Sequence, residues 1–592
     1  MDKLAAKQPP DARHGCRRIG FLGGLPAERY LLPLVLLITA FLYAKTFTYP
    51  FILDDNMQIV GNRHIMDAGY VRTYFTQDLW SHLPGKHLDA YYRPLLLLWF
   101  RANYVFFGDS SFYWHLSTVL MHLLCTTLVY VLALRFVADR MSAAVAAALY
   151  GVHPIQVEGV AWISGVNGSL CAVFVLMTLL CYLEFKKSKR DLWLAASVIG
   201  FAAALLAKES AMPFAAVILA YEWFAGTKRY RIAIPYFLVT GLYAIARVHA
   251  LAAPLGTVQG RFQMAQLMNL PWLLSIYARM LFLPNRLSVF YDFWSVQRLS
   301  DPRFWLPLLI MGAVALTCFV KSKRATFFLM WFLILLSPAF AYACVSMSGE
   351  VYNGRQLCLP LVPFCIGLAM AVEQTRSKYG LATFVLVLLP LAWMQTNYWA
   401  NSRLLFRHAY ETSPTSYLAA TTYIDQLVPE HEYEKAIQVG RSALVYHPDQ
   451  VVLREALARV EFLSGRYADA AADYEQVTGK LSERPDVWFR LGFSYLYLRR
   501  DADAVIALRR AVRVNDQEPA YHYELGTALL NLHQQDEGLA EIGEAVQLAG
   551  DSQVGKAYAR DFERLKASAS GSAVEPHDEI SQSSAKILTV HR

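Results

Sequence analysis

The chain of 592 residues is poor in charge, because Asp, Glu, Lys and Arg together make up only 17% of it. Soluble domains carry about 25% charged and about 45–50% apolar residues. Here 56% of the residues are hydrophobic, and up to about residue 397 they form recurrent apolar runs of about 16–22 residues. A helix of about 20 residues crosses the bilayer core. The composition therefore excludes a soluble enzyme, a disordered protein and a one-pass receptor, and it predicts a polytopic integral membrane protein.

The sequence also lacks the short motifs of several enzyme classes. It contains no P-loop, GxSxG, HExxH, GxGxxG or paired CxxC pattern, which disfavours ATPases, hydrolases and zinc enzymes. The eight cysteines mostly lie inside the apolar runs, and none follows residue 365. This spacing predicts neither a disulfide framework nor a metal site, so we expect the cysteines to be small core residues.

Charge of opposite sign separates two parts of the chain. Residues 411–592 hold 19 basic and 28 acidic side chains, whereas residues 1–410 hold 36 basic and 19 acidic ones. In the first part the basic residues lie in short clusters between apolar runs, as in Lys186-Lys187-Ser188-Lys189-Arg190. Such clusters mark the cytoplasmic loops of membrane proteins. We therefore assign the basic excess to topology and predict no nucleic-acid partner.

Pairing the apolar runs around these clusters predicts about eleven spans. Residues 1–29 lie in the cytoplasm, and an odd number of spans places the C-terminal part outside it. The predicted spans cover 30–45, 115–136, 142–158, 169–185, 191–207, 211–225, 232–251, 304–320, 325–343, 357–374 and 379–397. Two further stretches, 94–107 and 271–283, are short and carry an arginine, which favours interfacial or re-entrant helices. The membrane domain then covers 30–397, with a first external segment at 46–114, and a bacterial inner membrane is expected.

The part after the last predicted span repeats with a period of 34 residues. The period is carried by Ala436, Ala470, Ala504 and Gly538, and by Ala443, Val477, Ala511 and Ala545. This is the period of tetratricopeptide repeats, in which paired antiparallel helices approach closely at small residues. We predict a repeat domain at 398–565 on the extracytoplasmic side, followed by a disordered, Ser-rich tail at 566–592.

Charged residues at the ends of the predicted spans are the candidate functional residues. Asp54 and Asp55 follow the first span, and adjacent carboxylates raise one another's pKa unless they find partners. Asp54 is a candidate general base or acceptor-binding group, with Asp55 as its support or as a cation ligand. The alternative for the pair is a helix N-cap. Arg93 precedes the 94–107 stretch, where it either binds a lipid-linked phosphate or snorkels to lipid headgroups.

Further candidates end the third and fifth predicted spans. His153 and Glu158 flank the point at which Pro154 is expected to break the helix. His153 is either a substrate ligand or a capping residue, and Glu158 is a candidate catalytic carboxylate. Lys208 and Glu209 end the fifth span, where charged residues at membrane depth are either functional or form a salt-bridged turn.

Arg355 lies in a late external loop and is a second candidate phosphate ligand. The predicted topology places all these candidates on one face of the membrane. Carboxylates beside cations at a bilayer surface suit transfer from a phosphorylated lipid, because the cations hold the leaving phosphate while a carboxylate takes the proton of the incoming hydroxyl. This chemistry requires no cofactor, although the carboxylate pair would accept a divalent cation.

The combination resembles the transmembrane and tetratricopeptide repeat-containing O-mannosyltransferases and their bacterial relatives, in the GT-C superfamily. The resemblance is carried by residues along nearly the whole chain. They are Asp54-Asp55, Arg93-Pro94, Asn103, Gly108, His115, His122, His153-Pro154, Glu158, Val160, Trp162, Lys208-Glu209 and the segment Asn401 to Phe406 before the repeats.

The resemblance implies an all-α fold, with a GT-C-like transmembrane bundle followed by a tetratricopeptide α-solenoid. It implies an enzyme that moves a sugar, mannose-like, from a polyprenyl-phosphate donor to a protein hydroxyl or glycan acceptor outside the cytoplasm, with Asp54 as the catalytic carboxylate. The repeats would engage the acceptor. The competing hypothesis is a non-catalytic, membrane-anchored scaffold whose repeats assemble an envelope complex.

Overall fold

The computed structural model describes residues 28–83, 91–227, 229–251, 264–291, 295–345, 352–373 and 377–569, and every regular element in them is a helix. The all-α prediction is therefore confirmed for the described residues. Two compact units can be distinguished. The membrane unit comprises Met1–Leu287, Ser295–Met347 and Gly354–Asn401, and the repeat unit comprises Ser288–Trp294, Ser348–Asn353 and Ser402–Arg592.

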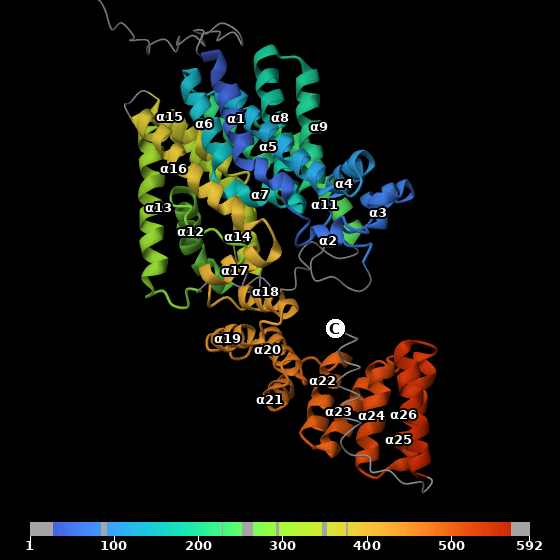
Figure 1. Ribbon diagram of the computed structural model, residues 1–592. Helices are drawn as coiled ribbons and strands as arrows, with labels where there is room; N and C mark the ends of the chain where they lie inside the picture. Colours follow the sequence, from blue (N-terminus) through green and yellow to red (C-terminus); the bar gives the residue numbers. More distant parts are fainter. Residues whose placement is uncertain are drawn as a thin grey trace, which may run out of the picture. The chain divides into compact units, whose positions relative to one another are not determined.

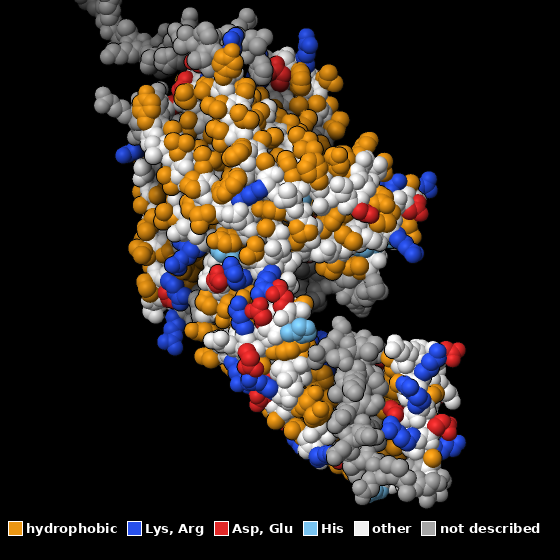
Figure 2. Space-filling model, viewed as in Figure 1, with side chains coloured by type: hydrophobic (Ala, Val, Ile, Leu, Met, Phe, Trp, Pro, Cys, Tyr) orange, Lys and Arg blue, Asp and Glu red, His pale blue; other side chains and the backbone are white. Residues whose placement is uncertain are grey.

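Within the described residues, seven helical segments of the membrane unit are long and apolar enough to cross a bilayer (Figure 1). They are Glu28–Thr48, which contains α1 (Leu31–Tyr43), Ser111–Ala133 (α5), Ile163–Ser188 with α8 (Asn167–Ser188), Tyr230–Leu251 with α11 (Ile234–Leu251), Pro302–Lys321 (α13), Lys323–Cys344 in α14 (Lys323–Val345) and Tyr379–Tyr398 in α16 (Ser377–Tyr398). Hydrophobic side chains dominate the surface of this unit in the view of Figure 2. An integral membrane protein is therefore confirmed.

Of the other four predicted spans, one is a helix with the predicted bounds 191–207, and three are helices shorter than predicted. They appear as α6 (Arg140–Val152), α9 (Asp191–Ala207), α10 (Phe214–Ala225) and α15 (Leu361–Val372), with 13, 17, 12 and 12 residues. A helix of 13 residues is only about 20 Å long, less than the bilayer core of about 30 Å. The expected span 142–158 was too long because the helix ends at Val152, where His153 leaves helical geometry and Pro154 follows.

The described part of the segment 46–114, which the sequence predicts to be external, folds into short elements. They are α2 (Asp55–Gln58), α3 (Arg63–Met66), the 3-10 helix Ala68–Phe75 and α4 (Pro94–Phe107). Ile59, Ile65 and Tyr74 pack with Leu96 and Phe100 of α4 in one buried cluster. The two short apolar stretches of the sequence are indeed helices, α4 and α12 (Leu270–Phe282). Their placement at the membrane interface stays a prediction.

The repeat unit confirms the 34-residue period in its helix boundaries. Each repeat consists of two helices. From α19 onward, the first helices of successive repeats begin 34 residues apart, and so do the second helices. The helices are α17 (Ser402–Thr412), α18 (Tyr417–Leu427), α19 (Tyr433–Leu444), α20 (Val451–Leu463), α21 (Tyr467–Val477), α22 (Pro485–Tyr497), α23 (Asp501–Val514), α24 (Pro519–Asn531), α25 (Gln535–Ala549) and α26 (Gln553–Ala569). Residues 570–592 of the predicted disordered tail, like residues 1–27 of the predicted cytoplasmic segment, lie outside the described residues.

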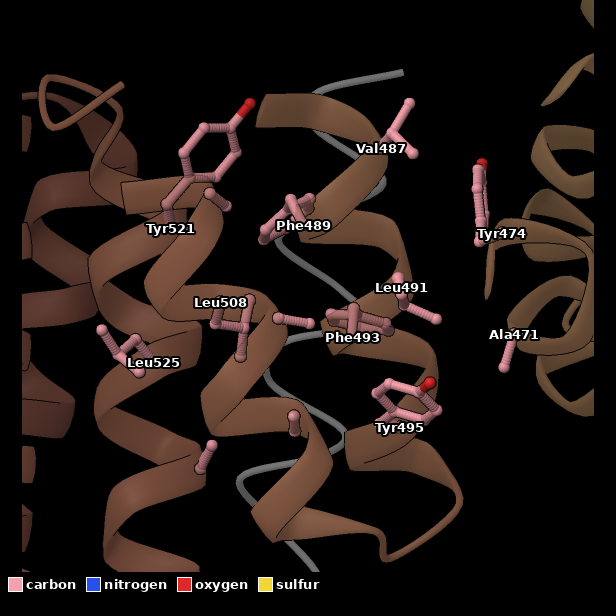
Figure 3. Close-up of a cluster of buried hydrophobic side chains, with 14 of the residues drawn as sticks. Ala471, Tyr474, Val487, Phe489, Leu491, Phe493, Tyr495, Leu508, Tyr521 and Leu525 are labelled. Atoms are coloured by element: carbon pink, nitrogen blue, oxygen red, sulfur yellow. The ribbon is translucent and has the colours of Figure 1, made fainter. Parts of the chain in front are cut away.

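Small residues in the repeats allow neighbouring helices to approach closely. A Cβ atom at Gly492 would lie 2.5 Å from the side chain of Leu508, and one at Gly526 would lie 2.5 Å from that of Ile542. Aromatic and aliphatic side chains of α22 fill the adjoining core, with Phe489, Leu491 and Phe493 buried (Figure 3). The spacing read from the sequence therefore marks contacts between paired helices.

Candidate functional site

The carboxylate pair lies in a tight turn between the first long helix and α2. Leu53 has φ +53°, in the left-handed region that a branched side chain rarely adopts. Asp54 then caps the start of α2 through its backbone, since its carbonyl accepts hydrogen bonds from the amides of Met57 and Gln58, and no side-chain cap bond forms. Asp54 therefore occupies the N-cap position that the alternative predicted, but its carboxylate does not form the capping hydrogen bond.

Asp55 is fully buried and holds this turn against a distant part of the chain. Its Oδ1 accepts a bond from the backbone amide of Ser164 at 2.8 Å and another from the Ser164 hydroxyl at 2.6 Å. Its Oδ2 accepts a weaker bond from the amide of Ile52 at 3.3 Å. Burial raises the pKa of Asp55 to about 7, although the bonds from Ser164 oppose the shift. Asp55 therefore anchors the turn that presents Asp54.

Arg93 and Glu209 form a two-pronged ion pair. Arg93 is the residue before α4, and Glu209 begins the short 3-10 helix Glu209–Ala211 after α9. Nε of Arg93 donates to Oε2 of Glu209 at 3.0 Å, and Nη2 donates to Oε1 at 2.5 Å. Burial alone would raise the pKa of Glu209, but the Arg93 guanidinium outweighs it and lowers this pKa to about 2. The pair is therefore charged and joins the loop before α4 to the turn after α9.

Glu158 and Arg355 form a second pair. Glu158 lies on α7 (Val157–Ala161), the helix that restarts after Pro154, and its Oε1 is 2.9 Å from Nε of Arg355. The angle at this contact does not make a hydrogen bond, so the attraction is mainly between charges. A Cβ at Gly354 would lie 3.4 Å from Oε2 of Glu158, which is van der Waals contact, so the loop carrying Arg355 runs directly beside the carboxylate.

Lys208 lies among these two pairs. Its ammonium group interacts electrostatically with Arg93, Arg355, Glu209 and Glu158. Burial lowers the pKa of Lys208, and repulsion by Arg93 adds to this effect. In the part of the chain that the structure describes, Lys208 makes no ion pair within 4.0 Å, unlike the two arginines. The cluster thus contains three cations and two carboxylates. Lys208 is the cation without an ion-pair partner among the described residues, and we call it uncommitted.

Two tryptophans and a serine belong to the site although the sequence did not single them out as functional. Trp162 stacks on Trp399 with ring centroids 6.3 Å apart, and the Arg355 guanidinium lies 5.1 Å from the Trp162 ring centre. Ser164, two residues later, binds Asp55. The family resemblance already included Trp162, whereas nothing in the spacing of Ser164 and Trp399 distinguishes them from packing residues.

His153 is turned away from the charge cluster. Its Nε2 lies 3.0 Å from the carbonyl of Leu281, and its Nδ1 accepts a bond from the amide of Ile155 at 3.3 Å. Burial lowers the pKa of His153 to about 4, so the ring is neutral at pH 7. Both ring nitrogens are used by the backbone, which matches the capping alternative; substrate binding by His153 stays a prediction.

The described residues contain no group of three or more His, Cys, Asp and Glu side chains arranged to hold a metal ion. The described cysteines are all free, and Cys171 and Cys358 lie buried beside Lys208. Of the eight candidates, five therefore meet in one charge cluster: Arg93, Glu158, Lys208, Glu209 and Arg355. Asp55 is linked to this region through Ser164, with Asp54 beside it.

Residues 92–254 match the family described as dolichyl-phosphate-mannose-protein mannosyltransferase, a segment that contains Arg93, Glu158, Lys208 and Glu209 but neither Asp54 nor Arg355. The mouse protein O-mannosyl-transferase TMTC3 is 23% identical over 496 residues, which cover 74% of this chain and 54% of that protein. The Drosophila melanogaster protein O-mannosyl-transferase Tmtc1 is 31% identical over 172 residues, 29% of this chain and 20% of that one.

Among solved structures, the tetratricopeptide protein YrrB is 20% identical with a TM-score of 0.25, covering 27% of this chain and 83% of its own. Over the matched segment the chain is therefore similar to dolichyl-phosphate-mannose-protein mannosyltransferases. It is also similar to the TMTC protein O-mannosyl-transferases, as the resemblance predicted. The chain spans about half the length of the mouse relative.

The Arg93–Glu209 pair should stabilise the fold measurably. In Glu209→Gln the Arg93 guanidinium loses its charged partner, and we expect a loss of about 2–3 kcal/mol, below the range for fully buried pairs because 26% of the Glu209 side chain is exposed. Thermal unfolding of the purified chain in one detergent measures this. The control is Glu184→Gln, whose 3.5 Å contact with Arg135 is more exposed and should change stability by less than about 0.5 kcal/mol.

The stability that the Arg93–Glu209 pair contributes should depend on pH. Because the folded-state pKa of Glu209 is lowered from 4.5 to about 2, its contribution is present above about pH 4.5 and disappears as the pH falls towards 2. The stability difference between wild type and Glu209→Gln should therefore shrink over that window. Equal stabilities of the two proteins at pH 7 would contradict the role given to the pair.

Proposed function

We propose that the chain is a membrane glycosyltransferase that moves mannose, or a closely similar sugar, from a polyprenyl-phosphate donor to a hydroxyl group of a protein outside the cytoplasm. The single observation that carries the proposal is the uncommitted Lys208 between two Arg–Glu pairs. Three cations against two carboxylates leave a net positive charge in a poorly solvated place, where an anion such as a phosphate binds favourably. The family match over 92–254, which contains Lys208, agrees with this donor.

The roles of the side chains follow from this charge balance. The hydroxyl oxygen of the acceptor attacks the anomeric carbon of the sugar, and the bond between that carbon and the phosphate oxygen breaks. The electron pair stays on the phosphate, whose growing charge Lys208 stabilises, with Arg93 and Arg355 near it. The acceptor proton passes to the carboxylate of Asp54. Attack opposite to the leaving phosphate inverts the anomeric configuration.

Glu158 and Glu209 have supporting roles in this proposal. Each holds an arginine by an ion pair, at 2.9 Å for Glu158 and at 2.5 Å for Glu209. Because burial raises the pKa of Glu158, Glu158 is also the second candidate for the base. Asp55 positions Asp54 through the bonds from Ser164. A divalent cation is not required by this mechanism, and chelator treatment would reveal one.

The repeat unit is proposed to bring protein acceptors to the membrane unit. Stacked helix pairs form an extended surface suited to binding polypeptide segments. For this to work, the repeats must lie on the same side of the membrane as Asp54. That placement follows if all eleven predicted segments cross, with α6, α9, α10 and α15 crossing as short helices completed by flanking residues, and with α4 and α12 at the interface.

The scaffold hypothesis remains the competitor, and one observation separates the two. A membrane anchor that only displays repeats has no need for five charged groups gathered at half-buried or buried positions. Such an arrangement is unfavourable for stability unless it is used, because each ion loses hydration.

The first prediction from the proposed function concerns Asp54. Asp54→Asn keeps the size of the side chain but removes the proton acceptor, so transfer should fall by at least about 100-fold while the protein inserts normally. Transfer of label from radiolabelled polyprenyl-phosphate mannose to protein in membranes measures this. Asp109→Asn is the matched control, since Asp109 is an exposed aspartate just after α4, and it should transfer at the wild-type rate. Near-native transfer by Asp54→Asn at normal protein levels would move the role to Glu158.

The second prediction concerns the repeat unit. A chain lacking 430–560 should bind the lipid donor as before but use protein acceptors poorly, because they are no longer held near the membrane. Donor binding and label transfer are measured on the same membranes. Undiminished use of protein acceptors by the shortened chain would rule out this role of the repeats.

The third prediction concerns topology. A periplasm-active reporter fused at about residue 420 should be active, and a cytoplasm-active reporter at the same place should be silent, because an odd number of spans follows a cytoplasmic N-terminus. A fusion in the basic loop at 186–190 is the control and should show the opposite pattern. Cytoplasmic activity at residue 420 would refute both the topology and an external active site.

A further inference from the structure

An open apolar groove lies on the membrane unit, and none of the five residues of the charge cluster lines it. It has a volume of about 600 Å³ and is bounded by α1 and α16. Leu37 and Phe41 line one side, and Leu389, Pro390 and Trp393 line the other. Leu37 is 67% exposed and Phe41 71% exposed, although both lie on a helix apolar enough to span the bilayer. These side chains are therefore expected to contact the lipids of the bilayer.

Pro390 contributes to the groove through the backbone. It lies inside α16, where it has no N–H group to donate to the carbonyl of Leu386. Helices accommodate an interior proline by a local bend or opening. The groove thus coincides with the place where α16 lacks one of its backbone hydrogen bonds.

A lysine lies at one end of the groove. Nζ of Lys45 is 3.9 Å from the centre of the Trp393 ring, and Phe41 stacks on the same ring with centroids 5.8 Å apart. Lys45 donates to two neutral acceptors of α16, the carbonyl of Trp393 and Oδ1 of Asn397, each at 2.5 Å. Among the described residues no carboxylate lies within 4.0 Å of it. Its positive charge is therefore held next to the groove without a counter-charge.

We propose that this groove binds one anionic phospholipid, with an acyl chain between α1 and α16 and the phosphate beside Lys45. The walls explain why a lipid binds, and Lys45 explains why an anionic lipid is preferred to a neutral one. The apolar walls accept a hydrocarbon chain of any lipid, whereas the unneutralised ammonium group, fixed by Asn397 and by the Trp393 ring, favours a headgroup with net negative charge. The proposal does not depend on the transferase activity.

Lys45 stays in place without the lipid because its two acceptors come from the backbone and from an amide. The site is thus preorganised, and the lipid supplies only the missing negative charge. One lysine near a membrane surface is worth about a fivefold preference for an anionic lipid.

The test uses the full chain in neutral detergent with a phosphatidylcholine probe that carries a photoreactive group in its acyl chain. Peptide mapping should place the cross-link on the groove walls, at Leu37, Phe41 or Leu389. Unlabelled phosphatidylglycerol should displace the probe about fivefold better than phosphatidylcholine with the same acyl chains. In Lys45→Gln, which keeps a hydrogen-bond donor, this ratio should fall to about one. Lys45→Arg should retain it.

Two controls separate charge from packing. Lys321→Gln removes a lysine at the end of α13, another candidate span, and should leave the fivefold ratio unchanged. Leu37→Trp adds bulk at an exposed position of the groove and should weaken both lipids equally. Equal displacement by the two lipids in the wild type, or an unchanged ratio in Lys45→Gln, would overturn the proposal. So would displacement of the probe by a polyprenyl phosphate at least as strong as that by phosphatidylglycerol, because the groove would then serve the donor.

Discussion

Charged side chains at the edge of a bilayer need partners, and the two ion pairs of the cluster meet this need across long separations in sequence. Taking an ion out of water costs several kcal/mol unless an opposite charge and hydrogen bonds replace the lost hydration. Arg93 and Glu209 are 116 residues apart, and their two bonds join the start of α4 to the end of α9. Glu158 and Arg355 join α7 to the loop before α15. These helix ends are therefore fixed relative to one another, and Lys208 lies between the two pairs.

The turn that carries Asp54 is held by hydrogen bonds to the neighbouring Asp55. Asp55 is buried and its carboxylate is satisfied by Ser164, so the preceding residue has little freedom. The left-handed conformation of Leu53 is unfavourable for a branched residue, and it persists because the bonds of Asp55 on one side and the first helix on the other determine the path between them. A residue whose backbone is held in this way loses little backbone entropy when a substrate binds, which suits the role proposed for Asp54.

The sequence predicted local features well and distant ones poorly. The 34-residue period of the repeats follows from contacts between neighbouring helices, so Gly492 and Gly526 could be found from spacing alone. Candidate charges were recognised because apolar runs leave them conspicuous at their ends. The choice of partners could not be predicted, since it depends on how loops far apart in the chain meet. Ser164 was missed because a serine in a short turn carries no periodic signal, and the predicted span at 142–158 was too long because apolar residues continue past the proline that ends the helix.

The same physics explains why one cation of the cluster is left uncommitted. A fully paired cluster would need a third carboxylate, and Asp55, the buried carboxylate held by Ser164, has a pKa near 7 and already accepts three hydrogen bonds. Neutralising Lys208 from within the chain would also remove the attraction for an incoming anion. Leaving it unpaired costs stability, because burial disfavours its charge. That cost is smallest when an anion is bound, so a cluster with this charge balance favours its occupied state and binds phosphate more tightly than a neutral cluster with the same donors would.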